Sequence, residues 1–281
     1  MVPGGVIKCV GVKVPRRRRN AAVAKKRSSL GLAAVLALNL LPSIACAAKP
    51  DKGVGINLHD VVYWAPVLVF NDLFKQTSQW IPQKRGSDEW NTGRPMDLDP
   101  DGWPRRLIGD QILTTLINPS VQYPNGFYRL SYEGKGKVVV DGDAEIVKTY
   151  PDGARLRVST AGGLFIKVLQ VDPSDPVRKI SLRLAETNGA AMETFNPEYR
   201  RYLQGFNVLR YMGWANTNDN KISNWAERSR PEHGTQERHG GVALEYMIDF
   251  ANYVGASPWF TIPTAADDNY VREMAKLIKE R

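Results

Sequence analysis

The chain has 281 residues and a formal net charge of +9, from 38 Lys and Arg against 29 Asp and Glu. Residues 1–48 contain nine of the basic residues and no acid, so the rest of the chain is formally neutral. A positive excess confined to one end gives no basic binding face, and this excludes nucleic acid as a partner of the remaining protein. Cys9 and Cys46 both lie in this segment. A chain cleaved beyond them forms no disulfide and has no thiolate for catalysis or zinc binding.

The N-terminal segment has the order of a secretory signal peptide. Basic residues precede the apolar run 30–41, and Pro42 and the small residues 45–47 follow it. This order predicts a signal peptide over residues 1–47, a secreted or periplasmic protein, and no membrane association after cleavage. The alternative is an uncleaved anchor, because residues 30–48 are nearly long enough to span a bilayer.

The middle of the chain is typical of antiparallel strands. Apolar and polar residues alternate in short runs between turns rich in Gly and Asp, at residues 127–132, 137–140, 154–158 and 164–169. Turns spaced by about ten residues favour a sandwich or jelly roll. We expect the preceding stretch, which contains Trp64, Trp80, Trp90 and Trp103, to add strands and long loops. The sequence thus predicts an N-terminal antiparallel β-sandwich or jelly-roll domain over residues 51–176.

Beyond a linker-like run at residues 172–176, strands alternate with helices. Strands are expected at residues 179–184, 207–212 and 258–262. Three helices are also expected: a short one that begins at Asn196-Pro197, a second over residues 241–254, and a third that begins at Asp267 or Asp268. Strand–helix alternation predicts parallel pairing. We therefore expect residues 177–281 to form the first three β/α units of an incomplete (β/α)8 barrel, truncated at Arg281. The alternative is a small open α/β domain, complete as it stands.

Residues 205–214 carry a resemblance. The run Gly-Phe-Asn-Val-Leu-Arg-Tyr-Met-Gly-Trp resembles the second barrel strand of retaining glycoside hydrolases of the large TIM-barrel clan (clan A type). Residues 195–197 and 241–263 resemble secreted bacterial proteins of that type, in which a β-domain precedes the barrel. The resemblance implies that Arg210 hydrogen-bonds and orients a nucleophilic carboxylate. An ordinary salt bridge at a strand end is the alternative for Arg210.

The same resemblance places the catalytic carboxylates at the ends of the fourth and seventh strands. No strand is expected after residue 262, so we expect no catalytic residue in this chain and no glycosidase turnover.

Substrate-binding candidates follow from the rule that barrel sites lie at the carboxyl ends of strands. They are Arg210, Trp214, Asn216, Asn218, Trp225, Arg228, Asp267 and Asp268. Indole faces stack on sugar rings while Asn and Asp meet hydroxyls, so a polysaccharide or oligosaccharide is the expected partner. Alternatively, Trp214 and Trp225 cover a core, and Asp267 or Asp268 caps a helix.

No metal or cofactor is expected. Residues 97–102 begin like a calcium loop, but Pro100 is awkward there and Ile108 stands where a Glu ligand is needed. His233 and His239 have no third ligand at suitable spacing.

Three functions remain open. The first is a fragment of a secreted glycoside hydrolase-like protein that acts on polysaccharide. The second is a carbohydrate-binding β-sandwich module without catalysis, with a stacking platform formed by Trp64, Trp80, Trp90 and Trp103. The third is a nonfunctional truncated remnant, destabilised by exposed sheet edges.

Overall fold

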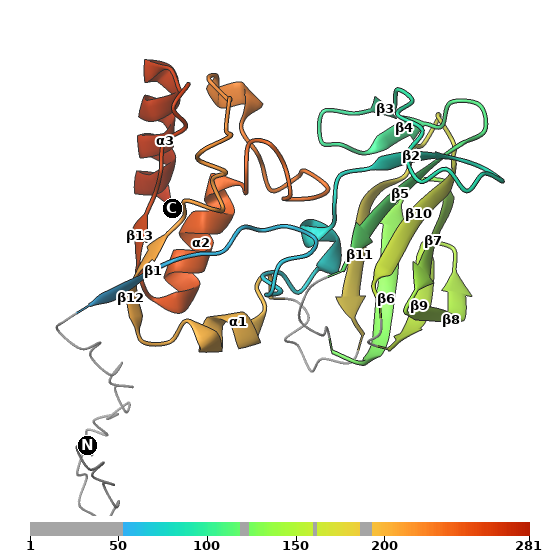
Figure 1. Ribbon diagram of the computed structural model, residues 1–281, viewed down its shortest axis with the longest axis horizontal. Helices are drawn as coiled ribbons and strands as arrows, with labels where there is room; N and C mark the ends of the chain where they lie inside the picture. The colour runs from blue at the N-terminus through green and yellow to red at the C-terminus, as the bar shows by residue number, and fades with distance from the viewer. Residues whose placement is uncertain (1–52, 119–123, 160–161, 186–192) are drawn as a thin grey trace, which may run out of the picture. The chain divides into compact units, whose positions relative to one another are not determined.

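The computed structural model describes residues 53–118, 124–159, 162–185 and 193–281 (Figure 1). The expected signal peptide, residues 1–47, lies outside these ranges. The described part is mostly β, with thirteen strands in four sheets and three α-helices. None of its helices combines the length and apolar character needed to cross a bilayer.

The predicted barrel is wrong. No sheet of the described residues closes on itself, and most strands pair antiparallel (Figure 1). The strand expected to begin the barrel, β11 (Arg178–Leu184), pairs antiparallel with β6 (Gly126–Glu133). Its alternating pattern does predict a strand, but alternation is typical of an antiparallel strand with one buried face, whereas a parallel strand covered on both faces is apolar throughout.

Two antiparallel four-stranded sheets face each other across a shared core. One has the order β2 (Ile81–Lys84), β5 (Gln111–Ile117), β10 (Leu164–Val171), β7 (Gly136–Gly142). The other has the order β11, β6, β9 (Gly153–Val158), β8 (Ala144–Tyr150). Between β2 and β5 in the sequence, the chain forms a small hairpin of β3 (Asp97–Leu98) and β4 (Pro104–Arg106). Leu113, Leu130, Leu156 and Ile166 are fully buried between the sheets, which explains the alternation in the sequence.

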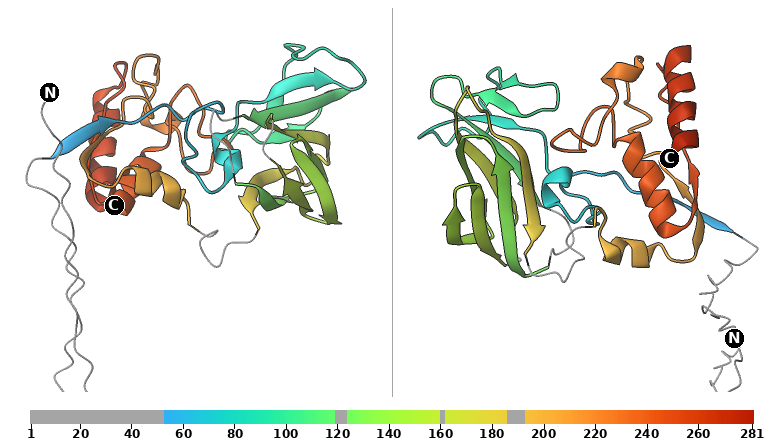
Figure 2. Two further views of the ribbon diagram at one scale, coloured as in Figure 1. Left: turned by 60° about the horizontal axis from the view of Figure 1, so that its bottom comes forward. Right: turned by 180° about the vertical axis from the view of Figure 1, so that it is seen from behind.

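A separate three-stranded sheet is parallel. Its order is β1 (Val54–Asn57), β12 (Phe206–Arg210), β13 (Ser257–Trp259). The chain leaves this sheet after β1, builds both antiparallel sheets, and returns through α1 (Pro197–Tyr202) to β12 (Figure 2). The sandwich is therefore an insertion between the first two strands of the parallel sheet.

Helix α2 (Leu244–Val254) connects β12 to β13, and α3 (Asp268–Glu280) follows β13. Leu209 of β12 is fully buried in a second core with Phe250 of α2. Because successive strand residues point to opposite faces, Val208 and Arg210 lie on the other face of the sheet. As the sequence predicts, α2 ends at Gly255, which adopts φ 72°.

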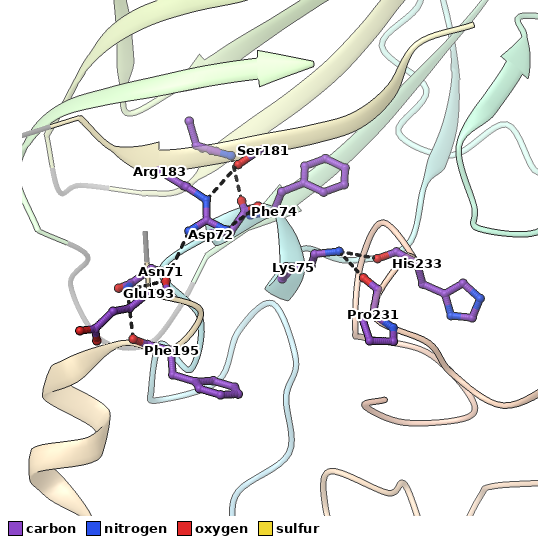
Figure 3. A network of polar contacts seen from close by, with 11 residues as sticks. Asn71, Asp72, Phe74, Lys75, Ser181, Arg183, Glu193, Phe195, Pro231 and His233 are labelled. Atoms are coloured by element: carbon purple, nitrogen blue, oxygen red, sulfur yellow. Dashed lines mark hydrogen bonds and ion pairs between the residues drawn. The ribbon is translucent and has the colours of Figure 1, made fainter. Parts of the chain in front are cut away.

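A polar network holds the loop 229–240 against the first residues of the insertion (Figure 3). Asp72 accepts hydrogen bonds from the backbone N–H of Phe74, at 3.1 Å, and of Leu182 in β11, at 2.9 Å. Lys75 Nζ donates to the carbonyls of Pro231 and His233, both at 2.8 Å. This network fixes the loop that forms one wall of the candidate site.

Candidate functional site

A cavity of about 200 Å³ lies just beyond the carboxyl ends of β1 and β12. We call it the carboxyl-end pocket and define it by its polar lining residues, Asp60, Gln79, Asn216, Gln236, Glu237, Arg238 and His239. Asp60 follows β1, Asn216 follows β12, and residues 236–239 belong to the loop held by Lys75. The carboxyl ends of parallel strands are where α/β proteins place ligand sites.

Gln236 anchors the loop wall. It is buried, its backbone N–H donates to the Lys75 carbonyl at 2.7 Å, and its Oε1 accepts from the Ala243 N–H at 2.9 Å. Its Nε2 donates to the Arg230 carbonyl at 3.1 Å. Because its amide oxygen and nitrogen both bond backbone groups, Gln236 stabilises the shape of the loop, whose neighbouring residues line the pocket.

Glu237 brings a partly buried carboxyl group to the pocket. Burial raises its pKa to about 7, against the opposing effect of the hydrogen bond that Oε2 accepts from the Tyr63 N–H at 2.6 Å. Near neutral pH the group is therefore present both as an acid and as a carboxylate. It can donate a hydrogen bond to a ligand or accept one.

Asp60 lies against the end of β12. A Cβ atom added to Gly213 would lie 2.1 Å from Asp60 Oδ1, so no other residue fits at position 213 while the carboxylate keeps its place. The Asp60 backbone N and the Leu58 carbonyl also lie within 3.0 Å of that added atom. The close approach of the two strand ends thus brings the Asp60 carboxylate to the pocket.

The last residues of the three parallel strands form a row on the open face of the sheet. Asn57 pairs in register with Arg210, and Arg210 with Trp259. The Arg210 guanidinium lies 5.1 Å from the centre of the Trp259 ring, and 56% of Trp259 is exposed. We call Asn57, Arg210 and Trp259 the strand-end row; it offers an amide, a guanidinium and an indole to solvent.

Arg210 and Asn216, two of the sequence-predicted residues, thus lie at the strand ends. Asn216 lines the pocket, where its Nδ2 donates to the His239 carbonyl at 3.0 Å. Arg210 shows no ion pair with any residue that the structure describes, and its buried Nε has no hydrogen-bond partner there. The nucleophilic carboxylate that the resemblance assigns to it is not seen beside it.

The other predicted residues do not offer a polar side chain or an exposed ring to the pocket. Trp214 borders the pocket but is a core residue, 1% exposed. Trp225 and Arg228 pair with each other, the guanidinium 4.2 Å from the ring centre, and Arg228 also bonds Glu245 at 2.7 Å. Asn218 is exposed.

The Asp pair follows the capping alternative. Asp267 is the N-cap of α3 and accepts from the Tyr270 N–H at 2.6 Å, while Asp268 is the first residue of the helix and is exposed. Neither belongs to the carboxyl-end pocket.

Sequence reasoning missed Asn57, Asp60, Glu237, Arg238 and Trp259 as site residues. Trp259 was expected in a strand, but its face depends on pairing with β12. Asp60 closely follows strand β1, but that strand has only four residues, too few for periodicity to identify it in the sequence. Glu237 lies in an irregular loop without a motif.

Comparison of the chain with protein-family models, curated proteins and solved structures finds no match. In the part of the chain that the structure describes, no group of three or more His, Cys, Asp or Glu residues could hold a metal ion.

Proposed function

We propose that this protein binds a saccharide at the carboxyl-end pocket, with the strand-end row as the stacking surface at the same strand ends. The observation that carries the proposal is a polar cavity beyond the carboxyl ends of β1 and β12, together with an exposed indole, Trp259, at the end of the neighbouring strand β13. Sugar hydroxyls donate and accept hydrogen bonds, and the pocket offers carboxyl, amide and guanidinium groups for both roles. The C–H face of a sugar ring stacks on an indole.

Two further observations support this ligand class. Residues 205–214 resemble a strand of glycoside hydrolases, and the leader at residues 1–47 has the order of a secretion signal. An exported protein meets polysaccharides outside the cytoplasm, so we place its action there. The proposal concerns recognition and includes no hydrolysis.

The sandwich offers a weaker stacking surface than its four tryptophans suggest. Trp103 is 5% exposed and stacks on Phe74, and Trp80 donates its Nε1–H to the Gly102 carbonyl. Trp64 and Trp90 are half-exposed. Because two of the four rings pack against the protein core, the proposed four-ring platform does not form.

Affinity electrophoresis and calorimetry with a panel of soluble polysaccharides and oligosaccharides test the proposal. Trp259→Ala should weaken binding about tenfold through loss of one stacked ring. Trp90→Ala is the matched control, because Trp90 is 50% exposed but borders the sandwich residue Phe165.

The reverse result, with loss of binding in Trp90→Ala and none in Trp259→Ala, would move the site to the sandwich. Absence of binding across the whole panel by folded protein would reject saccharide recognition.

A further inference from the structure

A second, smaller cavity adjoins the carboxyl-end pocket. Its volume is about 70 Å³, and its walls are mainly apolar, with Phe74, Trp80, Met96 and Leu98 among them. Gln79 and Arg238 line both cavities. The large polar pocket and the small apolar cavity therefore meet at the Gln79 amide and the Arg238 guanidinium.

Arg238 stands at this junction with hydrogen-bonding capacity to spare. Its Nη1 lies against Gly102, where an added Cβ would be 3.4 Å away. Burial lowers the pKa of Arg238, with the Arg230 charge acting in the same direction and Asp101 opposing both. No hydrogen bond from its guanidinium to a described residue is seen. A carbonyl oxygen placed at the junction would find donors on two sides, from Arg238 and Gln79.

We propose that the saccharide carries an acetyl group that enters the small cavity while its ring occupies the carboxyl-end pocket; this inference rests on the proposed function. The small cavity admits a group of a few heavy atoms and is too small for a second sugar ring. Its aromatic and aliphatic walls suit a methyl group. The carbonyl oxygen of the acetyl group would lie at the junction and accept from Arg238 or Gln79.

The charges around the junction disfavour an anionic substituent. Asp101 lines the small cavity, and Asp60 and Glu237 line the pocket next to it. A uronate carboxylate would face these acids as well as Arg238, whereas a neutral acetyl group avoids the repulsion. The linings of the two cavities therefore fit an uncharged hydrogen-bond acceptor that is attached to a short apolar group.

Calorimetry with matched ligand pairs tests the inference on the purified protein. One pair is O-acetylated xylo-oligosaccharides before and after alkaline deacetylation; the other is N-acetylglucosamine oligomers and acetyl-free glucose oligomers of the same linkage and length, which carry an uncharged hydroxyl in place of the acetamido group. Burial of one methyl group and its carbonyl contact should make the acetylated member of at least one pair bind about tenfold more tightly. The pair that responds identifies the O-acetyl or N-acetyl source.

Filling the small cavity provides the second measurement. Leu98→Trp should abolish the preference for the acetylated ligand and leave the affinity for the acetyl-free one unchanged. Leu107→Trp is the control, because Leu107 is also partly buried against the sandwich core but lines neither cavity. Thermal unfolding confirms that both variants are folded.

Equal affinities within both pairs would overturn the acetyl inference and leave saccharide binding intact. The acetyl inference is likewise overturned if Leu98→Trp weakens both members of a pair equally. Failure of every saccharide to bind would reject the proposed function itself, and the inference with it.

Discussion

Asp72 links the start of the insertion to strand β11 of the sandwich, and its replacement gives a quantitative test. Only 5% of the residue is exposed. Its Oδ1 accepts from Phe74 N–H, which caps the 3-10 helix Leu73–Gln76 (Figure 3). It also accepts from the buried Leu182 N–H in β11. Asp72→Ala removes the cap, at about 1 kcal/mol. It also leaves a buried N–H unsatisfied, at about 1–3 kcal/mol.

We therefore expect Asp72→Ala to lower the free energy of unfolding by about 2–4 kcal/mol in urea titrations at pH 7. Asp72→Asn keeps an acceptor oxygen in the same place and should cost about 1 kcal/mol or less. Similar losses in the two variants would show that the charge, and not the two hydrogen bonds, is what matters. A loss below about 1 kcal/mol in Asp72→Ala would refute the assigned role.

Three further predictions concern the site and its surroundings. The raised pKa of Glu237 means that the native state retains a proton that the unfolded state releases, so stability falls as pH rises from 4.5 to about 7. Glu237→Gln should raise the melting temperature above pH 7 and leave it unchanged below pH 4.5; a pH-independent difference would contradict this. Arg228→Ala leaves the buried Glu245 carboxylate without its ion-pair partner and should lower the free energy of unfolding in urea by about 3–5 kcal/mol. The double variant Arg228→Ala/Glu245→Ala should regain most of that stability, and equal losses in the single and double variants would disprove the coupling. Gly213→Ala should displace Asp60 and weaken saccharide binding about tenfold by calorimetry, and unchanged affinity would remove Asp60 from the site.

The strands and helices that have one apolar and one polar face could be predicted from local sequence. The run 127–132 lies within β6, the run 164–169 within β10, and the helix ending before Gly255 is α2. In each, the side chains that face the core recur at the period of the element itself, every second residue in a strand and about every 3.6 residues in a helix, so the pattern is visible in a short stretch of sequence. The same pattern says nothing about the partner strand.

The barrel prediction failed for that reason. The 179–184 run reads as a strand, and its position after a linker-like segment suggested a new domain, but β11 completes the sandwich beside β6. The strand that takes its expected place beside β12 is β1, which pairs with Phe206–Arg210 from far along the chain. Four residues in β1 carry too weak a pattern to reveal a long-range partner.

Local sequence was enough to identify the charge asymmetry of the leader, the strands at residues 127–132, 137–140, 154–158 and 164–169, and the amphipathic α2 with its glycine end. Tertiary structure alone decided that Asn57, Arg210 and Trp259 align in one row, and that Asp60 and Glu237 face one pocket. Periodicity records how far each side chain is withdrawn from water, whereas a site depends on which distant segments pack together. That choice is made by the whole chain at once, through the burial of both cores and the pairing of strands separated by the insertion.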